Sequence, residues 1–206
     1  MKTVSDSKRA FYSAYPRPIN SVYRRVIEEL LVEMHLLATN SDFTTDPLFT
    51  LGVVDSFDRF MDSYRPPADR KSLFDAICHA VDANGDAYRQ EAATVKEFAA
   101  SMAGKDIVAW MTAPQADGSG TKLAEALQSI ANNPRFKYSR LFGIGMYTAI
   151  EQAAPDLVKD DKQRQEAVVK IAEALKISGD KLQKDMDAYR SNLDKLVQME
   201  AVMADA

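Results

Sequence analysis

Apolar side chains recur at helical spacing along the segment from Ser7 to Leu37. The intervals of four, four, four and three residues are set by Val22, Val26, Leu30, Met34 and Leu37. Such intervals place one apolar stripe along an α-helix, and Asn20 stands where an N-cap is expected. The pattern predicts a core helix over residues 21–38, roughly 27 Å long at 1.5 Å per residue, around which other helices pack.

The same periodicity continues along the chain, and glycine and proline divide it into segments. We expect further helices over residues 5–15, 47–64, 69–83, 86–103, 105–112, 121–131 and 134–153. Asp46 before Pro47 is typical of an N-cap with proline at the first helical position, and residues 114–120 read as a flexible loop. No segment shows the sustained alternation of a β-strand. The sequence therefore predicts an all-α, multi-helix bundle.

Beyond Pro155 the composition shifts toward charged residues. After Gly179 the apolar positions follow heptad spacing, with Leu182, Met186, Tyr189, Leu193 and Leu196. A seam of only two to three heptads favours a helix packed on its own domain over a stable coiled coil. We expect a globular bundle over residues 1–155 and a charged C-terminal helical extension over residues 156–206, packed on the bundle or projecting from it.

Composition and charge narrow the possible partners. The chain has 206 residues, 46% of them hydrophobic, which suffices to bury a core. A formal charge of -4 gives no general attraction to nucleic acid, so no nucleic-acid partner is expected. The single cysteine excludes an internal disulfide.

No apolar run is long enough to span a bilayer and no signal peptide is evident, so membrane association is expected to be peripheral.

The histidines and the cysteine do not form a catalytic pattern. His35 falls on the stripe of the long helix and is expected to flank the core, since no second ligand follows at metal-binding spacing. Cys78 and His79 are neighbours, and adjacent helical residues point about 100° apart, whereas a nucleophile needs its base within hydrogen-bond reach. A packing cysteine and a surface histidine are favoured.

Two other patterns could indicate a binding site, but each has a simpler structural interpretation. Asp55, Asp58 and Asp62 share one helix face that could hold a cation, but a solvated face with local ion pairs is favoured because Arg59 lies among them. Gly143 and Gly145 lack the context of a dinucleotide-binding loop. Small residues there are expected to let two helices approach closely. We assign no catalytic, cofactor-binding or metal-binding residue.

Function is therefore expected to reside in binding surfaces. Two basic stretches are candidate docking patches for an acidic partner or an anionic membrane, and they comprise Lys8, Arg9 and Arg17, and Arg135, Lys137 and Arg140. Arg24 and Arg25 are instead expected to pair with Glu28 and Glu29 at i, i+4. The C-terminal seam is a second candidate surface for a partner helix, and it comprises Leu182, Met186, Tyr189 and Leu193.

Three long stretches carry a family resemblance. They are SKRAFYSAYPRPINSVYRRVIEELLVEMHLL at residues 7–37, FTLGVVDSFDRFMDSYRP at residues 49–66, and FKYSRLFGIGMYTAIE at residues 136–151. In this order they closely resemble the thylakoid formation family, accessory factors of photosystem II in cyanobacteria and chloroplasts. The resemblance implies a non-enzymatic protein without a cofactor that acts in thylakoid biogenesis and in photosystem II assembly and repair.

The resemblance also implies partners and a location. Partners would be the FtsH-type membrane protease and photosystem II subunits. The location would be the cytoplasmic face of the thylakoid membrane, with peripheral attachment, or the stromal face if the protein is from a plastid. Two alternatives stay open: a helical bundle that binds a small apolar ligand such as a pigment or lipid, and a metal-dependent enzyme centred on the aspartates or His35.

Overall fold

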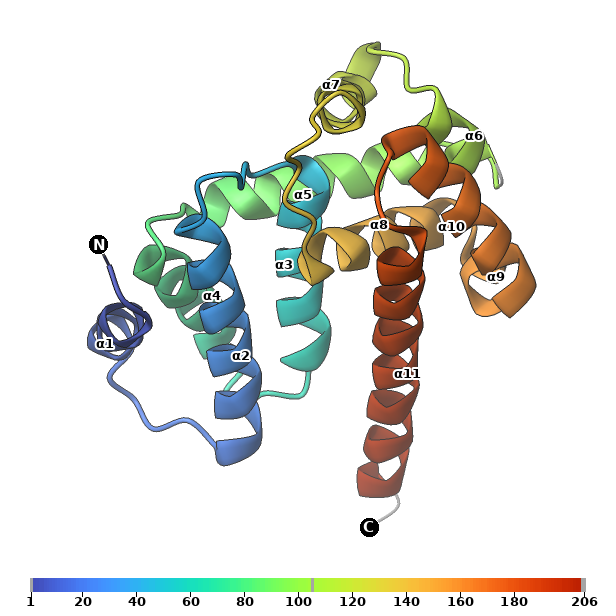
Figure 1. The fold of residues 1–206 in the computed structure, drawn as a ribbon. Coiled ribbons are helices and arrows are strands. Elements are labelled where there is room, and N and C mark those ends of the chain that lie inside the picture. The colour runs from blue at the N-terminus through green and yellow to red at the C-terminus, as the bar shows by residue number, and fades with distance from the viewer. Residues whose placement is uncertain (1, 105, 205–206) are drawn as a thin grey trace.

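The regular secondary structure in the described part of the chain is all helical. A computed structural model describes residues 2–104 and 106–204, with side chains up to residue 198, and this part of the chain contains no β-strand (Figure 1). The helices are α1 (Val4–Ala14), α2 (Ser21–Ala38), α3 (Pro47–Phe60), α4 (Asp69–Ala80), α5 (Gly85–Ala100), α6 (Asp106–Thr112), η1 (Gly118–Gly120), α7 (Thr121–Ala131), α8 (Arg140–Ala153), α9 (Pro155–Lys159), α10 (Asp161–Leu175) and α11 (Gly179–Ala204). The prediction of an all-α fold is confirmed.

Side-chain caps fix where several helices begin. The Asn20 side chain accepts a hydrogen bond from the Val22 amide at 3.0 Å, and Asp46 accepts from the first amides of α3 at 2.9 and 3.0 Å. Both predicted caps are confirmed. The helix expected over residues 134–153 begins only at Arg140, because Ser139 caps it by accepting from the Phe142 amide at 3.1 Å. That cap is visible in the sequence and was missed.

The centre of the molecule is the crossing of α3 and α8. Every residue from Pro47 to Phe57 is buried, as is every residue from Leu141 to Ile150. A Cβ added at Gly52 would overlap the backbone carbonyl of Leu141, and one at Gly145 would overlap that of Leu48. The expected close approach of helices is confirmed for Gly145, whereas Gly143 faces the side chains of Tyr138 and Asp185.

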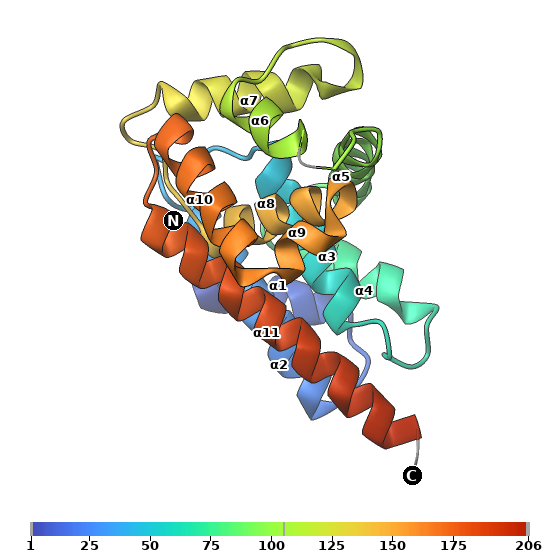
Figure 2. The same ribbon diagram turned by 90° about the vertical axis from the view of Figure 1, so that its right-hand side faces the viewer.

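The long helix α2 covers one side of this core and does not form its centre (Figures 1 and 2). Ile27, Leu31 and Met34 are buried, but Val22, expected on the buried stripe, is 61% exposed. The prediction that α2 is the central helix was wrong. Its apolar stripe is real, but α3 and α8 are buried on all sides because their glycines let them pack most closely.

The C-terminal helices share the core of the preceding ones. Val158, Ile171, Leu182 and Met186 belong to the same hydrophobic cluster as Phe57. The first half of α11 lies along the body of the protein, and its second half extends past the other helices (Figures 1 and 2). The division into two units at residue 155 stays a prediction, but the extension both packs on the bundle and projects from it.

Candidate functional site: a charged groove and the groove beside α2

A buried carboxylate joins four helices. Asp55 on α3 is 1% exposed and accepts hydrogen bonds from Thr148 Oγ1 of α8 at 2.8 Å and from Tyr189 Oη of α11 at 2.5 Å. Arg59 Nε lies 2.9 Å and Lys96 Nζ of α5 lies 3.1 Å from its oxygens. Asp55 therefore fastens α11 to the core.

Charge neutralisation keeps this carboxylate ionised. Burial alone would raise the pKa of Asp55, but Arg59, the Tyr189 hydroxyl, Lys96 and Thr148 together hold it below its usual value. The expectation of a solvated aspartate face was wrong for Asp55. Its two hydroxyl partners come from α8 and α11, and one of its two cations comes from α5, all far away in the sequence.

The expected local ion pair is present between Arg59 and Asp55, whereas the two other aspartates of the stripe pair with arginines of other helices. Asp58 accepts from both terminal nitrogens of Arg89 at 3.1 Å, and Asp62 lies 3.1 Å from Arg70 Nη1. Next to them, Lys71 contacts carboxylates of α4 and α5 at 2.8 and 2.9 Å. Among the residues that the structure describes, no group of three or more His, Cys, Asp or Glu side chains is arranged to hold a metal ion.

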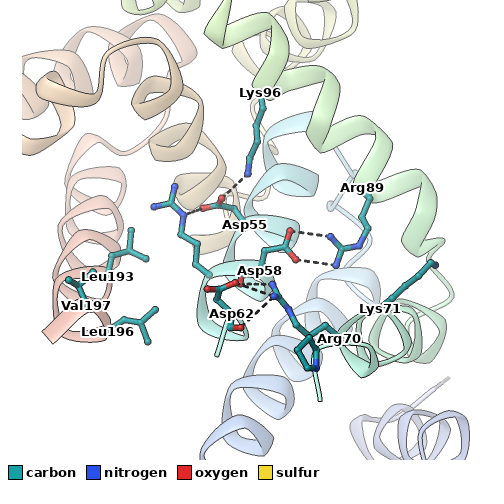
Figure 3. Close-up of a pocket in the computed structure, with 12 residues that line it drawn as sticks. Asp55, Asp58, Asp62, Arg70, Lys71, Arg89, Lys96, Leu193, Leu196 and Val197 are labelled. Carbon is teal, nitrogen blue, oxygen red and sulfur yellow. Dashed lines mark hydrogen bonds and ion pairs between the residues drawn. The ribbon is translucent and has the colours of Figure 1, made fainter. Parts of the chain in front are cut away.

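These ion pairs form one wall of a surface groove of about 740 Å³, which we call the charged groove (Figure 3). The wall comes from α3, α4 and α5. The opposite side is the projecting half of α11, which contributes Leu193, Leu196 and Val197. The first two are half-buried and Val197 is 65% exposed. The charged groove thus has a polar side and an apolar side.

The C-terminal seam is divided between the core and this groove. Leu182 and Met186 are fully buried and Tyr189 is 3% exposed. The prediction that the seam packs on its own domain is confirmed for these three residues. In this structure they are not open to a partner, because α11 packs on α8 and α10 and the Tyr189 ring lies against Phe60 and Tyr147. Of the predicted seam contacts, only Leu193 lines the charged groove.

The predicted basic residues are mostly paired with carboxylates of other elements. Lys8 lies 2.7 Å from Glu28, Arg9 lies 3.5 Å from Asp6, Arg17 lies 2.6 Å from Asp69, Arg135 lies 3.4 Å from Asp42, and Arg140 lies 2.5 Å from Glu33. Lys137 is exposed. The partners of Lys8 and Arg17 lie on other helices and could not be read from the sequence, whereas Asp6, three residues before Arg9 on the same helix, is visible in the sequence and was missed.

The structure brings Lys8 and Arg140 together beside α2. Both line a second surface groove of about 820 Å³, which we call the α2 groove. Leu36 lies in it and is 58% exposed. Arg17 and Arg135 do not line this groove. Of the two pairs expected within α2, Arg25 with Glu29 is present at 2.8 Å, whereas Glu28 binds Lys8 and Tyr12.

The remaining chemical candidates are structural. His35 is 5% exposed, and its Nδ1 lies 2.9 Å from the Ser7 hydroxyl, as expected for a residue at the core edge. His79 is exposed and Cys78 is buried, as predicted. Burial raises the pKa of the Cys78 thiol to about 12. Such a thiol is protonated at neutral pH and is not an activated nucleophile.

The fold and these surfaces define an all-helical protein whose polar and apolar grooves are suited to binding other proteins. None of the helices in the described part of the chain is long and apolar enough to cross a membrane. The sequence matches the model of the thylakoid formation protein family over residues 3–206, and the chain belongs to that family.

Individual relatives agree with this assignment. Protein Thf1 of Trichormus variabilis is 54% identical over 205 residues, covering 100% of this chain and 88% of the relative. Protein Thf1 of Synechococcus elongatus is 51% identical and covers 99% of this chain and 81% of the relative. The solved structure of Psb29 at 1.55 Å is 37% identical, covers 95% of this chain and 98% of its own, and superposes with a TM-score of 0.78.

Proposed function

We propose that this protein is a non-enzymatic accessory factor in thylakoid membrane biogenesis and in photosystem II assembly and repair. It binds an FtsH-type membrane protease and photosystem II subunits as a peripheral protein on the cytoplasmic face of the thylakoid. The observation that carries the proposal is the family match, which spans residues 3–206.

The α2 groove is the surface that we assign to these partners. Leu36 and Val32 are the apolar residues that line it, and Leu36 is 58% exposed. Lys8 and Arg140 lie at the groove in ion pairs with Glu28 and Glu33, and their side chains stay 37% and 47% exposed, so they form a polar rim. A central apolar contact surrounded by polar groups is the usual composition of a protein interface.

Affinity capture from thylakoid-containing cells tests the proposal. The tagged full chain should recover subunits of the FtsH-type protease and of photosystem II under conditions that preserve peripheral complexes. Leu36→Glu should reduce recovery several-fold by placing a charge at the centre of the contact. The matched control is Val169→Glu on α10, since Val169 is 48% exposed and lies away from the α2 groove.

Two results would count against the proposal. Failure of the unaltered chain to recover either partner removes the assigned role. Equal recovery by Leu36→Glu and Val169→Glu removes the α2 groove as the contact while leaving the role in place. Location is tested separately, since a peripheral protein is released from washed membranes by high salt or alkali, whereas an integral one is retained.

A further inference from the structure

The α2 groove follows one face of α2 along almost the whole helix. Its lining on α2 begins at Ser21 and ends at Leu36, and the intervals between successive lining residues alternate between three residues and one. Such intervals belong to a single helix face. From Ser21 to Leu36 the lining extends about 22 Å at 1.5 Å per residue. A strip of this length and spacing has the form of one side of a helix–helix contact.

Three ion pairs account for most of the charge in the α2 groove. They join Lys8 to Glu28 at 2.7 Å, Arg25 to Glu29 at 2.8 Å, and Arg140 to Glu33 at 2.5 Å. Arg24 also lines the groove and is exposed, and none of the described residues forms an ion pair or a hydrogen bond with its guanidinium. Glu28 lies one turn away, but its two carboxylate oxygens bind Lys8 and Tyr12 of α1. The packing of α1 on α2 thus occupies the carboxylate that the sequence offers to Arg24.

The two ends of the α2 groove differ in chemistry. Near the start of α2 the groove is lined by Ser21, Arg24 and Arg25, so this end is polar and carries the positive charge of Arg24. Further along α2 it is lined by Val32 and Leu36, and Leu36 is 58% exposed. An occupant that complements both ends must bring a carboxylate to Arg24 and apolar side chains to Leu36.

Other kinds of occupant fit this strip poorly. An anionic membrane would bring lipid phosphates against the carboxylates of Glu28, Glu29 and Glu33. A second copy of α2, paired antiparallel about a two-fold axis, would place Leu36 against Ser21 and Glu28 against Glu29. An extended segment would leave its backbone N–H and C=O groups unpaired, because those of α2 are already bonded within the helix. A helix satisfies its own backbone groups and avoids this cost.

We propose that the α2 groove receives an amphipathic helix of the partner. Apolar side chains of this helix pack on Leu36 and Val32, and an aspartate or glutamate near its other end pairs with Arg24. The inference rests on the proposed function, which assigns the groove to the protease and photosystem II subunits, and it adds the chemistry of the segment that the partner contributes.

Photo-crosslinking in the full chain measures the shape of that segment. One variant carries 4-benzoylphenylalanine in place of Ser21 and another in place of Leu36, and each is irradiated in thylakoid-containing cells before the crosslinked peptides are sequenced by mass spectrometry. Both positions should crosslink to one continuous segment of one partner subunit, at sites about 15 residues apart, since a helix rises 1.5 Å per residue over about 22 Å. An extended segment would place the sites about seven residues apart. That spacing, crosslinks to lipid, to a second copy or to two separate segments, or no crosslink from either position overturns the proposal.

A charge reversal tests the acidic contact. Arg24→Glu should lower recovery of the partner in affinity capture about tenfold, because it replaces a charge-assisted contact with two like charges. Lys162→Glu is the matched control and should leave recovery unchanged, because Lys162 is exposed on α10 and lies outside the α2 groove. Circular dichroism confirms that both variants are folded. If the unaltered chain recovers its partner and the two variants do so equally, the acidic helix is refuted while the role stands. If the unaltered chain recovers no partner, the role fails and this inference fails with it.

Discussion

The crossing of α3 and α8 provides the most direct test of how this fold is held together. Gly145→Ala adds one methyl group that would overlap the carbonyl carbon and oxygen of Leu48. Both atoms belong to the backbone, so no side-chain rotation relieves the overlap and the helices must separate. Overpacking a core typically costs about 1–3 kcal/mol and occasionally more. A backbone clash at the most buried crossing belongs at the upper end of that range.

The higher helix propensity of alanine partly offsets the free-energy cost of this overlap. Replacing glycine by alanine within a helix gains about 1 kcal/mol, so we expect Gly145→Ala to lower the free energy of unfolding by about 2 kcal/mol or more. This change in the free energy of unfolding is measured by urea denaturation, monitored by circular dichroism. Gly179→Ala is the control, because its Cβ would meet Ala172 Cβ at an ordinary 3.4 Å, and stability should hold or rise slightly.

A double variant sharpens the test. Gly52→Ala would clash with the carbonyl of Leu141 across the same crossing. Once one alanine has forced the helices apart, the second methyl group overlaps less with the opposite backbone and costs less free energy. The cost of the double variant should therefore fall short of the sum of the single costs by about 0.5 kcal/mol or more. If Gly145→Ala is as stable as the Gly179→Ala control, the close-approach explanation is wrong.

Three further predictions concern buried polar groups. Burial, with a contribution from Glu91, raises the pKa of Asp46 to about 7. The folded state then binds this proton more tightly than the unfolded state, so the associated stability is full below about pH 4 and is lost as the pH rises toward 7. Asp46→Asn should keep the cap and exceed the unaltered chain in thermal stability at pH 8 but not at pH 4. Tyr189→Phe should cost about 1–2 kcal/mol by removing one hydrogen bond to Asp55. Asp55→Ala should cost more, about 3–5 kcal/mol, because it leaves the buried Thr148 and Tyr189 hydroxyls without their acceptor and removes the carboxylate that Arg59 and Lys96 share; equal costs in urea denaturation would contradict this ordering. Cys78 should react with a thiol reagent only as fast as the protein opens, and a fast reaction in the native state would contradict its burial.

Features set by neighbours in the sequence were predictable, and features set by distant contacts were not. The caps Asn20 and Asp46 depend on amides two or three residues away, so the sequence alone located them. Asp55 looked like part of a solvated stripe because its local neighbours are charged. Its burial depends on Thr148 and Tyr189, which lie 93 and 134 residues further along the chain. The pattern of apolar and polar residues within α3 does not indicate those contacts.

Dependence on distant contacts also explains why the ion pairs of the basic residues and the role of Gly52 were not predicted from the sequence. The sequence indicated that Gly145 serves close packing, but its counterpart Gly52 became apparent only when α3 and α8 were seen to cross. The basic residues of the first segment read as a free patch because their carboxylate partners, such as Glu28 for Lys8 and Asp69 for Arg17, lie 20 and 52 residues away. Charge patches inferred from sequence therefore overestimate free charge wherever helices fold back on one another.

The division of the α11 seam determines which experiments can test its role. Heptad spacing shows that one edge of a helix is apolar, but it does not show whether the covering surface belongs to the same molecule. Here the cover changes along the helix: Tyr189 is the last fully buried residue of the seam, Leu193 is half-buried against the core, and Val197 is 65% exposed. Removing all of α11 after Ser178 would take Leu182, Met186 and Tyr189 out of the core. At about 2–5 kcal/mol for each large buried side chain, that loss approaches the entire stability of about 5–15 kcal/mol expected for a domain. Loss of a partner by such a truncation would report unfolding, whereas a substitution at the exposed Val197 leaves the core intact and tests the surface itself.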